Sequence, residues 1–310
     1  MSRGEEEMRL PQVLAELVYR TVGDFTIIAD RSWPRDNSVV WEIADSRDRR
    51  WYVKQHPTPL FHEREATAYQ KWTAALGPQR APMLRTADKQ AQAIVVSGLP
   101  GRIIKALNLT AADEQEIYRQ LGELMRCLHL AAPPKDDHQA GTGVRRVIER
   151  VEEHLRRASK LVDPSDAGLV RRHAAQLADI APLLPSVPSH GYLQPRNVLW
   201  DGARRIVALI DFERAEFAPA VRDLVRLEYG PWDGRTDLRE AFFSGYGRRL
   251  SEAEKQALTC YAAIDAISGL QRGTRHGDQH LVARAHRTLA RLAERQRYRC
   301  ANVPRPISGG

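Results

Sequence analysis

The sequence lacks a long apolar run. Its longest apolar stretches, such as residues 206–210, have the length of a strand and fall far short of the ~18 consecutive apolar residues that a membrane span needs. Residues 1–10 are acidic and contain no apolar segment of the secretory type. We therefore expect no membrane partner and no secretory signal.

Cysteine is also scarce. The three cysteines, Cys127, Cys260 and Cys300, are odd in number and far apart in the chain. This spacing excludes a disulfide framework and the paired cysteines of a zinc site. A reducing compartment is the default for such a chain, and we expect a cytoplasmic location.

Basic residues are in excess but are not concentrated. The 310 residues include 47 Lys and Arg against 39 Asp and Glu, for a net charge of +8. The basic residues are scattered among Glu and Ala in helical stretches, which is typical of solvated helix faces. A nucleic-acid partner would favour a concentrated basic stripe, so we do not expect one, although an RNA-binding or scaffold role remains an alternative. The oligomeric state stays open.

The first hundred residues are predicted to be mainly strands. Apolar, β-branched runs bounded by turn residues indicate strands at residues 25–29, 39–43, 51–53, 83–86 and 93–96. Between the third and fourth strands, residues 61–76 change to a helical period, and Gly77 followed by Pro78 ends that helix. Glu65 lies on the apolar stripe of this helix, and Glu63 does not.

Residues 98–101 are rich in Gly and Pro, and the composition becomes helical after them. Thr110 is a suitable N-cap for a long helix, and most of the chain beyond residue 223 also has helical character. We predict an α+β fold with a β-rich lobe at residues 1–97 and a hinge at 98–109. A helical lobe follows at 110–297, and a flexible tail at 298–310.

The stretch from His190 to Asn197, of sequence H-G-Y-L-Q-P-R-N, carries the most chemical information. Asp211 follows it by fourteen residues, directly after an apolar strand at residues 206–210. A hairpin of strands 197–200 and 206–210 would bring Asn197 and Asp211 together at its open end. An amide oxygen and a carboxylate are the kind of ligands that suit Mg²⁺, together with substrate phosphates.

These motifs resemble the aminoglycoside phosphotransferase and choline kinase superfamily, which has a two-lobe, protein-kinase-like fold. The family pattern is H-G-D-x-x-x-x-N followed by a strand-borne I-D-F or I-D-L. Residues 121–129, 221–224 and 244–247 also resemble family elements, and all the matches fall in the family's order between about residues 25 and 250. Among 221–224, Asp223 is expected to brace the catalytic loop.

The resemblance implies a nucleotide site that takes ATP or GTP with Mg²⁺. Lys54 corresponds to the nucleotide-binding lysine, and Glu65 to its partner. Asn197 and Asp211 correspond to the metal ligands, and Asn197 also belongs to the catalytic loop. The candidate residues of the hinge and of the loop before the second strand are Ser97 and Leu99 for adenine, and Asn37 and Ser38 for phosphate.

Two of these assignments keep alternatives. The segment that holds Asn37 and Ser38, residues 32–38, has no glycine, so a plain polar hairpin loop is an equal possibility. His190 is a candidate catalytic residue, but its counterpart in kinases braces the loop, and this structural role is the preferred interpretation.

Tyr192 is the main departure from the family pattern. It stands where the family has the aspartate that accepts the proton of the substrate hydroxyl. A tyrosine phenol is neutral at pH 7 and cannot be the same base. Since a positioned base contributes about 10²–10⁴-fold, its loss predicts a slow enzyme or a non-enzyme.

Three functions follow from the resemblance. The first is transfer of a γ-phosphate to a hydroxyl of a small molecule such as an aminoglycoside or another natural product, as in antibiotic resistance. A cationic acceptor of this kind would need acidic residues, for which the candidates are Glu213, Glu216, Asp233 and Asp237. The others are a nucleotide-binding pseudoenzyme and a kinase for a peptide Ser or Thr hydroxyl.

Overall fold

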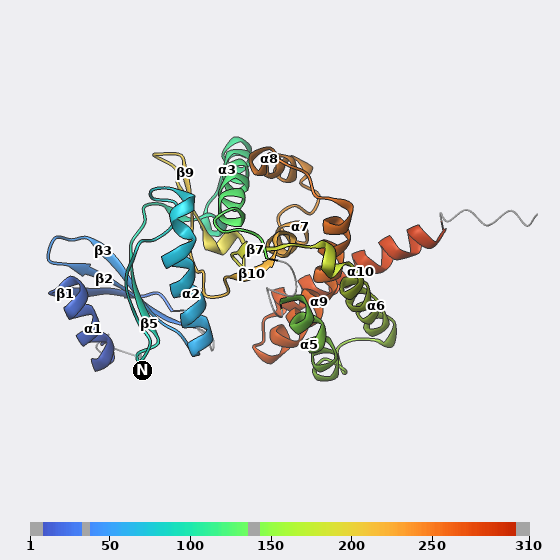
Figure 1. Ribbon diagram of the computed structural model, residues 1–310, viewed down its shortest axis with the longest axis horizontal. Helices are drawn as coiled ribbons and strands as arrows, with labels where there is room; N and C mark the ends of the chain where they lie inside the picture. The colour runs from blue at the N-terminus through green and yellow to red at the C-terminus, as the bar shows by residue number, and fades with distance from the viewer. Residues whose placement is uncertain (1–8, 33–37, 136–142, 302–310) are drawn as a thin grey trace, which may run out of the picture. The chain divides into compact units, whose positions relative to one another are not determined.

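A five-stranded antiparallel sheet forms the N-terminal part of the computed structural model, which describes residues 9–32, 38–135 and 143–301 (Figure 1). Its strand order is β1-β2-β3-β5-β4. The turn between β2 and β3 is fixed by Asp45, whose carboxylate accepts the backbone N–H groups of Arg47 and Arg49. The strands are β1 (Phe25–Asp30), β2 (Val39–Asp45), β3 (Arg50–Gln55), β4 (Leu84–Asp88) and β5 (Ala93–Ser97).

Helix α1 (Gln12–Val22) packs its apolar stripe on this sheet. Leu14, Leu17 and Val18 repeat at helical spacing and are buried against Trp41 and Trp51 of the sheet. Pro11 precedes the helix and Gly23, at φ 84°, follows it. The sequence analysis did not predict this helix.

Helix α2 (Pro59–Lys71) contacts β4 and β5 and continues into the short helix η1 (Thr73–Leu76). Thr58 caps its N-terminus by accepting the N–H of Phe61. Glu65 on this helix is buried, whereas Glu63 is exposed, as the predicted periodicity required. Gly77, at φ 89°, ends the segment.

Helices α3 (Ala111–His129) and α8 (Thr236–Tyr246) pack closely. A methyl group on Gly122 would lie 2.0 Å from the Phe242 carbonyl oxygen, and one on Gly245 would lie 1.8 Å from the Arg119 carbonyl oxygen. Both positions therefore require glycine. Thr110 caps α3, as predicted, by accepting the N–H of Asp113.

A three-stranded sheet of order β6-β8-β9 contains the predicted hairpin. Strands β8 (Val198–Asp201) and β9 (Ile206–Leu209) pair antiparallel, and β6 (Arg102–Ile103) adds a short edge. The helix η4 (Pro195–Asn197) leads into β8. Two further short strands, β7 (Ser186–Ser189) and β10 (Glu216–Pro219), form a separate pair.

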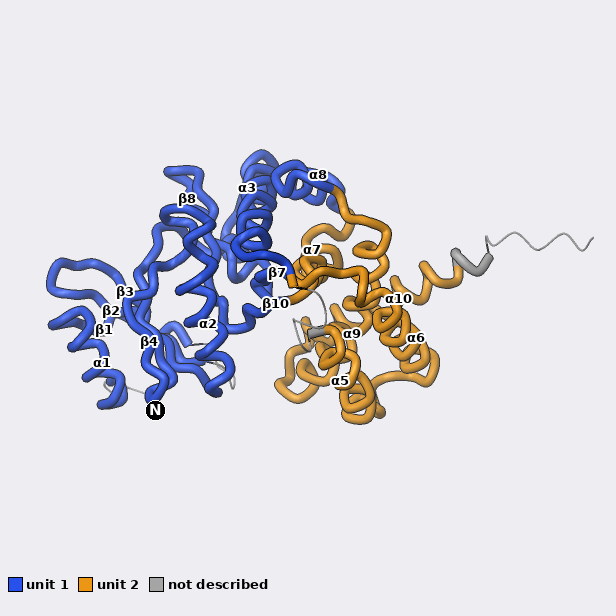
Figure 2. The backbone as a smooth tube through the Cα atoms, in the orientation of Figure 1, with its two compact units in different colours: residues 1–134, 187–217, 235–248 blue, residues 135–186, 218–234, 249–310 orange. Residues whose placement is uncertain are grey.

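The chain divides into two compact units (Figure 2). The first contains the five-stranded and three-stranded sheets with α1, α2, α3 and α8 and comprises Met1–Pro134, Val187–Phe217 and Arg235–Arg248. The second is helical and comprises Lys135–Ser186, Ala218–Gly234 and Arg249–Gly310. Its longer elements are α5 (Gly143–Arg157), α6 (Pro164–Ile180), α7 (Val225–Glu228), α9 (Glu252–Arg275) and α10 (Gln279–Ala301), with the short helices η3 (Ala181–Leu183) and η5 (Ala220–Leu224).

The predicted α+β class, with a β-rich N-terminal lobe and a helical C-terminal region, is confirmed. The lobe boundaries and the hinge at 98–109 stay a prediction, because the compact units follow a different division. Helix α10 continues to Ala301, and the predicted tail also stays a prediction. No helix among the described residues has the length and apolar character to cross a membrane.

Candidate functional site

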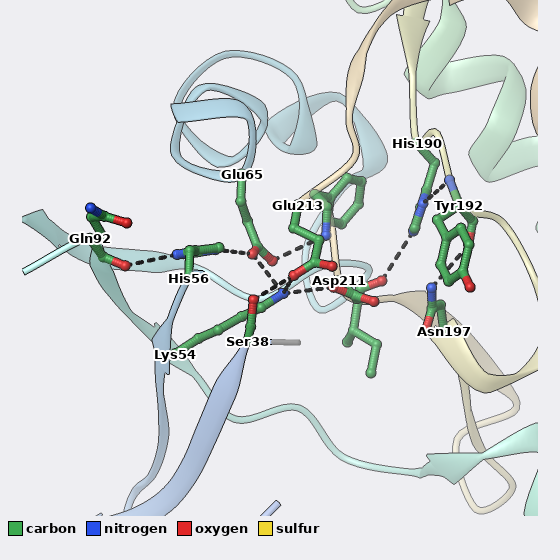
Figure 3. A network of polar contacts seen from close by, with 12 residues as sticks. Ser38, Lys54, His56, Glu65, Gln92, His190, Tyr192, Asn197, Asp211 and Glu213 are labelled. Atoms are coloured by element: carbon green, nitrogen blue, oxygen red, sulfur yellow. Dashed lines mark hydrogen bonds and ion pairs between the residues drawn. The ribbon is translucent and has the colours of Figure 1, made fainter. Parts of the chain in front are cut away.

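Lys54 lies at the centre of a buried ionic cluster in the first unit (Figure 3). Its Nζ is 2.8 Å from Glu65 Oε2, 2.6 Å from Asp211 Oδ1 and 3.1 Å from Glu213 Oε2. The lysine is on β3, the first glutamate on α2, and the other two carboxylates follow β9. Segments far apart in the sequence thus meet at one ammonium group, and the pairing of Lys54 with Glu65 is the predicted one.

Electrostatics keep this cluster ionised. Burial alone would lower the pKa of Lys54, but the carboxylates around it outweigh burial and raise its pKa well above the ordinary value. Burial would also raise the pKa of Asp211, yet Lys54, and more weakly Arg196, lower it to about 2. Three carboxylates around one ammonium leave a surplus of negative charge, which a bound cation would relieve.

Both carboxylate oxygens of Glu65 are used. Oε1 accepts the backbone N–H of Phe212 at 3.1 Å, and Oε2 contacts both Lys54 and His56 Nε2, the latter at 2.6 Å. The other ring nitrogen of His56 faces the carbonyl oxygen of Gln92 at 3.1 Å. Glu65 therefore ties the strand that carries Lys54 to the backbone next to Asp211.

His56 was missed by the sequence analysis. The signal was its position two residues after Lys54, because alternate residues of a strand share a face. The side chain is buried, with 4% of the residue exposed, and its hydrogen bond helps to satisfy the buried carboxylate of Glu65.

Asp211 has an unusual backbone. Its φ is 69°, in the left-handed region that few residues other than glycine adopt, although aspartate tolerates it better than most. This conformation follows directly on the end of β9 and turns the chain toward Lys54. The Asp211 side chain keeps 25% of its surface exposed, so it is the carboxylate of the cluster with the most access to a ligand.

The open end of the β8–β9 hairpin brings Asn197 next to Asp211 through the backbone, as predicted. The N–H of Ile210 donates to the carbonyl oxygen of Asn197 at 3.1 Å. The Asn197 side chain donates its Nδ2 to the carbonyl oxygen of Tyr192 at 2.9 Å. This hydrogen bond orients the amide so that Oδ1 is the atom left for a metal ligand.

His190 is fully buried, and both of its ring nitrogens meet the backbone. Nε2 lies 3.1 Å from the carbonyl oxygen of Ile210, and Nδ1 accepts the N–H of Tyr192 at 3.3 Å. These contacts call for the neutral tautomer with the proton on Nε2. The ring also packs on Phe212, with centroids 4.7 Å apart. This is the geometry of a side chain that braces the loop.

The loop requires glycine at position 191. Gly191 has φ 74°, and a methyl group there would lie 2.0 Å from the carbonyl oxygen of Arg214. The segment that carries Tyr192 thus lies directly against the segment that follows Asp211.

Tyr192 lies between two guanidinium groups. The Cζ of Arg196 is 4.8 Å from the centroid of its ring, and the Cζ of Arg214 is 5.0 Å from it. Arg214 also stacks on Phe61, at 5.1 Å from that ring. The position predicted to correspond to the family's aspartate is therefore aromatic, with two guanidinium groups against it.

The residues predicted to contact phosphate and adenine differ in whether their polar groups already have partners in the protein. Asn37 lies outside the described residues, and Ser38 is buried with its hydroxyl donating to Glu213 Oε2 at 2.6 Å. At the hinge, the N–H groups of Ser97 and Gly98 donate to the carbonyl oxygens of Met83 and Arg50. Within the described residues, the N–H of Leu99 has no such acceptor, so it is the hinge donor that a nucleobase could use.

Each acidic residue proposed for a cationic acceptor already pairs with a cation of the chain. Glu213 contacts Lys54, and Glu216 forms an ion pair with Arg64. Asp237 is 2.8 Å from Arg235, and in the second unit Asp233 is 3.1 Å from Arg291. Asp223, also in the second unit, is buried in η5.

The donor set fits Mg²⁺ at Asp211 and Asn197, since one ionised carboxylate and one amide oxygen leave room for phosphate oxygens and water. A second group of possible ligands, His56, Glu65 and Glu213, has its ligand atoms within 4.8 Å of one another. The ammonium of Lys54 contacts both carboxylates of that second group, so it already supplies their cation.

A lysine on a strand paired with a glutamate on the next helix, then a His–Asn loop and an aspartate after a hairpin strand, is the arrangement of the kinase-like class of phosphotransferase folds. A family model described as the phosphotransferase enzyme family matches residues 31–264. The chain therefore belongs to this family. No curated protein matches it in sequence.

Solved structures of antibiotic phosphotransferases share the fold. An aminoglycoside phosphotransferase, APH(4)-Ia, is 14% identical with a TM-score of 0.68 over 91% of this chain and 98% of its own. The GDP and kanamycin complex of APH(2")-IIia is 16% identical, with a TM-score of 0.65 over 91% and 98%. The macrolide 2'-phosphotransferase MphH from Brachybacterium faecium is 20% identical, with a TM-score of 0.57 over 90% and 98%. At these identities the similarity establishes the fold.

Proposed function

We propose that the chain is a Mg²⁺- and nucleotide-dependent phosphotransferase that acts on a hydroxyl of a small molecule. The observation that carries this proposal is the cluster of Lys54, Glu65 and Asp211 beside Asn197. It combines an ionised lysine, which can meet phosphate oxygens, with an ionised carboxylate of low pKa, which can hold a divalent cation.

The nucleotide would lie between the hinge and this cluster. The N–H of Leu99 would meet the base, and Lys54 would meet the phosphates. Both ATP and GTP can accept a hydrogen bond from one hinge donor, so the binding measurement described below uses both nucleotides. Glu65 would keep the ammonium of Lys54 in place, because it is itself fixed by His56 and by the backbone of Phe212.

Asp211 and Asn197 would hold the Mg²⁺. When bound, the ion neutralises charge on the phosphate oxygens. His190 would brace the loop through its two backbone contacts. Because phosphoryl transfer passes through a loose transition state, positioning and charge neutralisation supply most of the rate, and the loss of the acidic base at Tyr192 slows the reaction without abolishing it.

The second candidate is a nucleotide-binding pseudoenzyme, which Tyr192 itself favours. Tyrosine at this position cannot accept the hydroxyl proton at neutral pH, and its ring is fixed between Arg196 and Arg214. In this alternative the Lys54 cluster would bind nucleotide and no acceptor would react. A kinase acting on a peptide Ser or Thr hydroxyl remains a variant of the first candidate.

Two measurements test the proposal. Calorimetry with ATP and with GTP, each with and without Mg²⁺, should show binding that depends on the metal. Release of ADP or GDP should then increase when an acceptor is added. Metal-dependent binding with no release for any acceptor would support the pseudoenzyme, and no binding of either nucleotide would contradict both candidates.

A further inference from the structure

Arg214 stands out among the charged residues near the site. Its guanidinium lies between two aromatic rings, 5.1 Å from the centroid of Phe61 and 5.0 Å from that of Tyr192. Within the described residues, no carboxylate pairs with it and no hydrogen bond uses its side chain. It is half-buried and follows Asp211 by three residues.

This environment prepares a guanidinium for an anion. Aromatic rings stabilise a nearby cation, and a guanidinium presents its N–H groups in a fixed, planar fork. That fork matches the geometry of a carboxylate or a phosphate. Two other arginines of the first unit have such a partner already: Arg64 pairs with Glu216, and Arg235 with Asp237.

Arg196 adds a second positive group beside Tyr192. Its Cζ lies 4.8 Å from the Tyr192 ring, and it directly precedes Asn197, the other proposed metal ligand. The two guanidinium groups therefore lie beside Tyr192 and next to the proposed metal ligand, where a phosphoryl group would be transferred. A polycationic acceptor would be repelled here.

We infer that the acceptor is an anionic small molecule, such as a hydroxy acid or a sugar phosphate, whose carboxylate or phosphate is bound by Arg214. The inference rests on the proposed phosphotransferase function and names its substrate class. In the reaction, the acceptor oxygen bonds to the γ-phosphorus and the bond from that phosphorus to the bridging oxygen breaks. The nucleoside diphosphate leaves with the electron pair, and the hydroxyl proton passes to solvent water.

Tyr192 acquires a role in this arrangement. Its ring is one wall of the slot that holds Arg214, whereas a carboxylate at the same position would pair with the guanidinium and neutralise it. The replacement of the family's aspartate thus agrees with an anion-binding acceptor site.

The experiment compares anionic and cationic probes on the full chain. Gluconate, glycerate and glucose 6-phosphate are tested against kanamycin, by calorimetry on protein saturated with Mg²⁺ and a non-hydrolysable ATP analogue, and by ADP release with ATP. At least one of the three anions should bind, and kanamycin should not. Binding of kanamycin in preference to all three, or no binding of any anion, would overturn the inference.

The variant Arg214→Gln provides a second test of the inference. It should weaken binding of the anionic acceptor by about 10- to 100-fold, the range for a lost hydrogen bond to a charged group, and leave the nucleotide Kd within twofold. Arg205→Gln is the matched control: Arg205 lies at the turn of the β8–β9 hairpin, stacks on Trp200 and pairs with Asp113. A loss of nucleotide affinity in Arg214→Gln with unchanged acceptor binding would assign Arg214 to the nucleotide phosphates and refute the inference.

Failure of the two proposals can be told apart. If wild-type protein binds no nucleotide with Mg²⁺, the proposed function fails. If it binds nucleotide but prefers kanamycin to the anions, only the inference about the acceptor fails.

Discussion

At the scale of single residues, Asp211 is the most exposed carboxylate of the Lys54 cluster and is the metal ligand that we propose. We expect Asp211→Asn to abolish the effect of Mg²⁺ on nucleotide binding, because it removes the charge while keeping the size of the side chain. In calorimetry, the affinity for ATP with Mg²⁺ should fall at least tenfold, to the level measured without Mg²⁺. Asp201→Asn, at the other end of the same hairpin, is the control. A variant that keeps the full Mg²⁺ effect would exclude Asp211 as the ligand.

Replacing Tyr192 should change both kcat and the KM of the acceptor. Tyr192→Asp should raise kcat by about 10²-fold, the low end of what one positioned base supplies. It should also raise the KM of an anionic acceptor, because the new carboxylate would neutralise Arg214. Tyr192→Asn removes the ring without adding a base, so its kcat should not rise. Equal kcat values for the Asp and Asn variants would show that the reaction does not use a base at this position.

Single-residue contacts were predicted where periodicity decided them. Glu65, and not its neighbour Glu63, faces Lys54 because it lies on the apolar stripe of α2. His56 and Arg214 could not be found in the same way. His56 meets Glu65 of another element and Gln92 of a turn 36 residues away, and Arg214 lies in a loop whose path has no period.

At the scale of elements, the longer helices and strands of the described chain agree with the sequence pattern, but the short ones do not follow from it. Strand β6 has two residues and β10 has four, which is too few for an alternation to be recognised. Helix α1 has a clear apolar stripe, but its stability depends on the two tryptophans of the sheet that it covers. An isolated helix of this length would be marginal in water.

The contact between α3 and α8 gives a prediction at this scale. Gly245→Ala should destabilise the protein by about 1–3 kcal/mol, because its methyl group would overlap the backbone of Arg119 and force the helices apart. Gly168→Ala on α6 is the matched control, since the nearest atom there belongs to the flexible end of Arg172, at 3.3 Å. In a helix that change should be stabilising, by up to about 1 kcal/mol. Urea unfolding measures both, and equal signs would contradict the close-packing argument.

At the scale of the whole molecule, the order of the motifs was enough to predict the fold class. The side chains on which a substrate would depend were less predictable, since the four acidic candidates turned out to be paired with cations. Many of the arginines are likewise paired with carboxylates of the chain. Arginines form ion pairs within α3, between α5 and α6, and between α7 and α9, for example Arg119 with Glu116, Arg171 with Glu152 and Arg226 with Asp265. The net positive charge is therefore not evidence for a nucleic-acid partner.

Because of these ion pairs, the free energy of unfolding should depend on pH. Asp265 in the second unit is the clearest case. Its carboxylate lies 2.6 Å from Arg226 and 3.7 Å from Arg284. Burial would raise the pKa of Asp265, but the two arginines lower it well below the ordinary 3.8. A carboxylate with a lowered folded pKa stabilises the protein above its unfolded pKa and loses that contribution as the pH falls toward the folded pKa.

Asp265→Asn should therefore reduce the free energy of unfolding by about 2 kcal/mol at pH 7, the range for a hydrogen bond to a charged group. The difference from the wild type should shrink steadily as the pH falls below 4, because the unfolded wild-type chain then takes up a proton that the folded chain does not. Urea unfolding at pH 7, 4 and 3 measures this trend. The control is Asp179→Asn, at an exposed position on α6, which should change little at any of these values. A difference for Asp265→Asn that is as large at pH 3 as at pH 7 would show that its effect comes from packing and not from the charge.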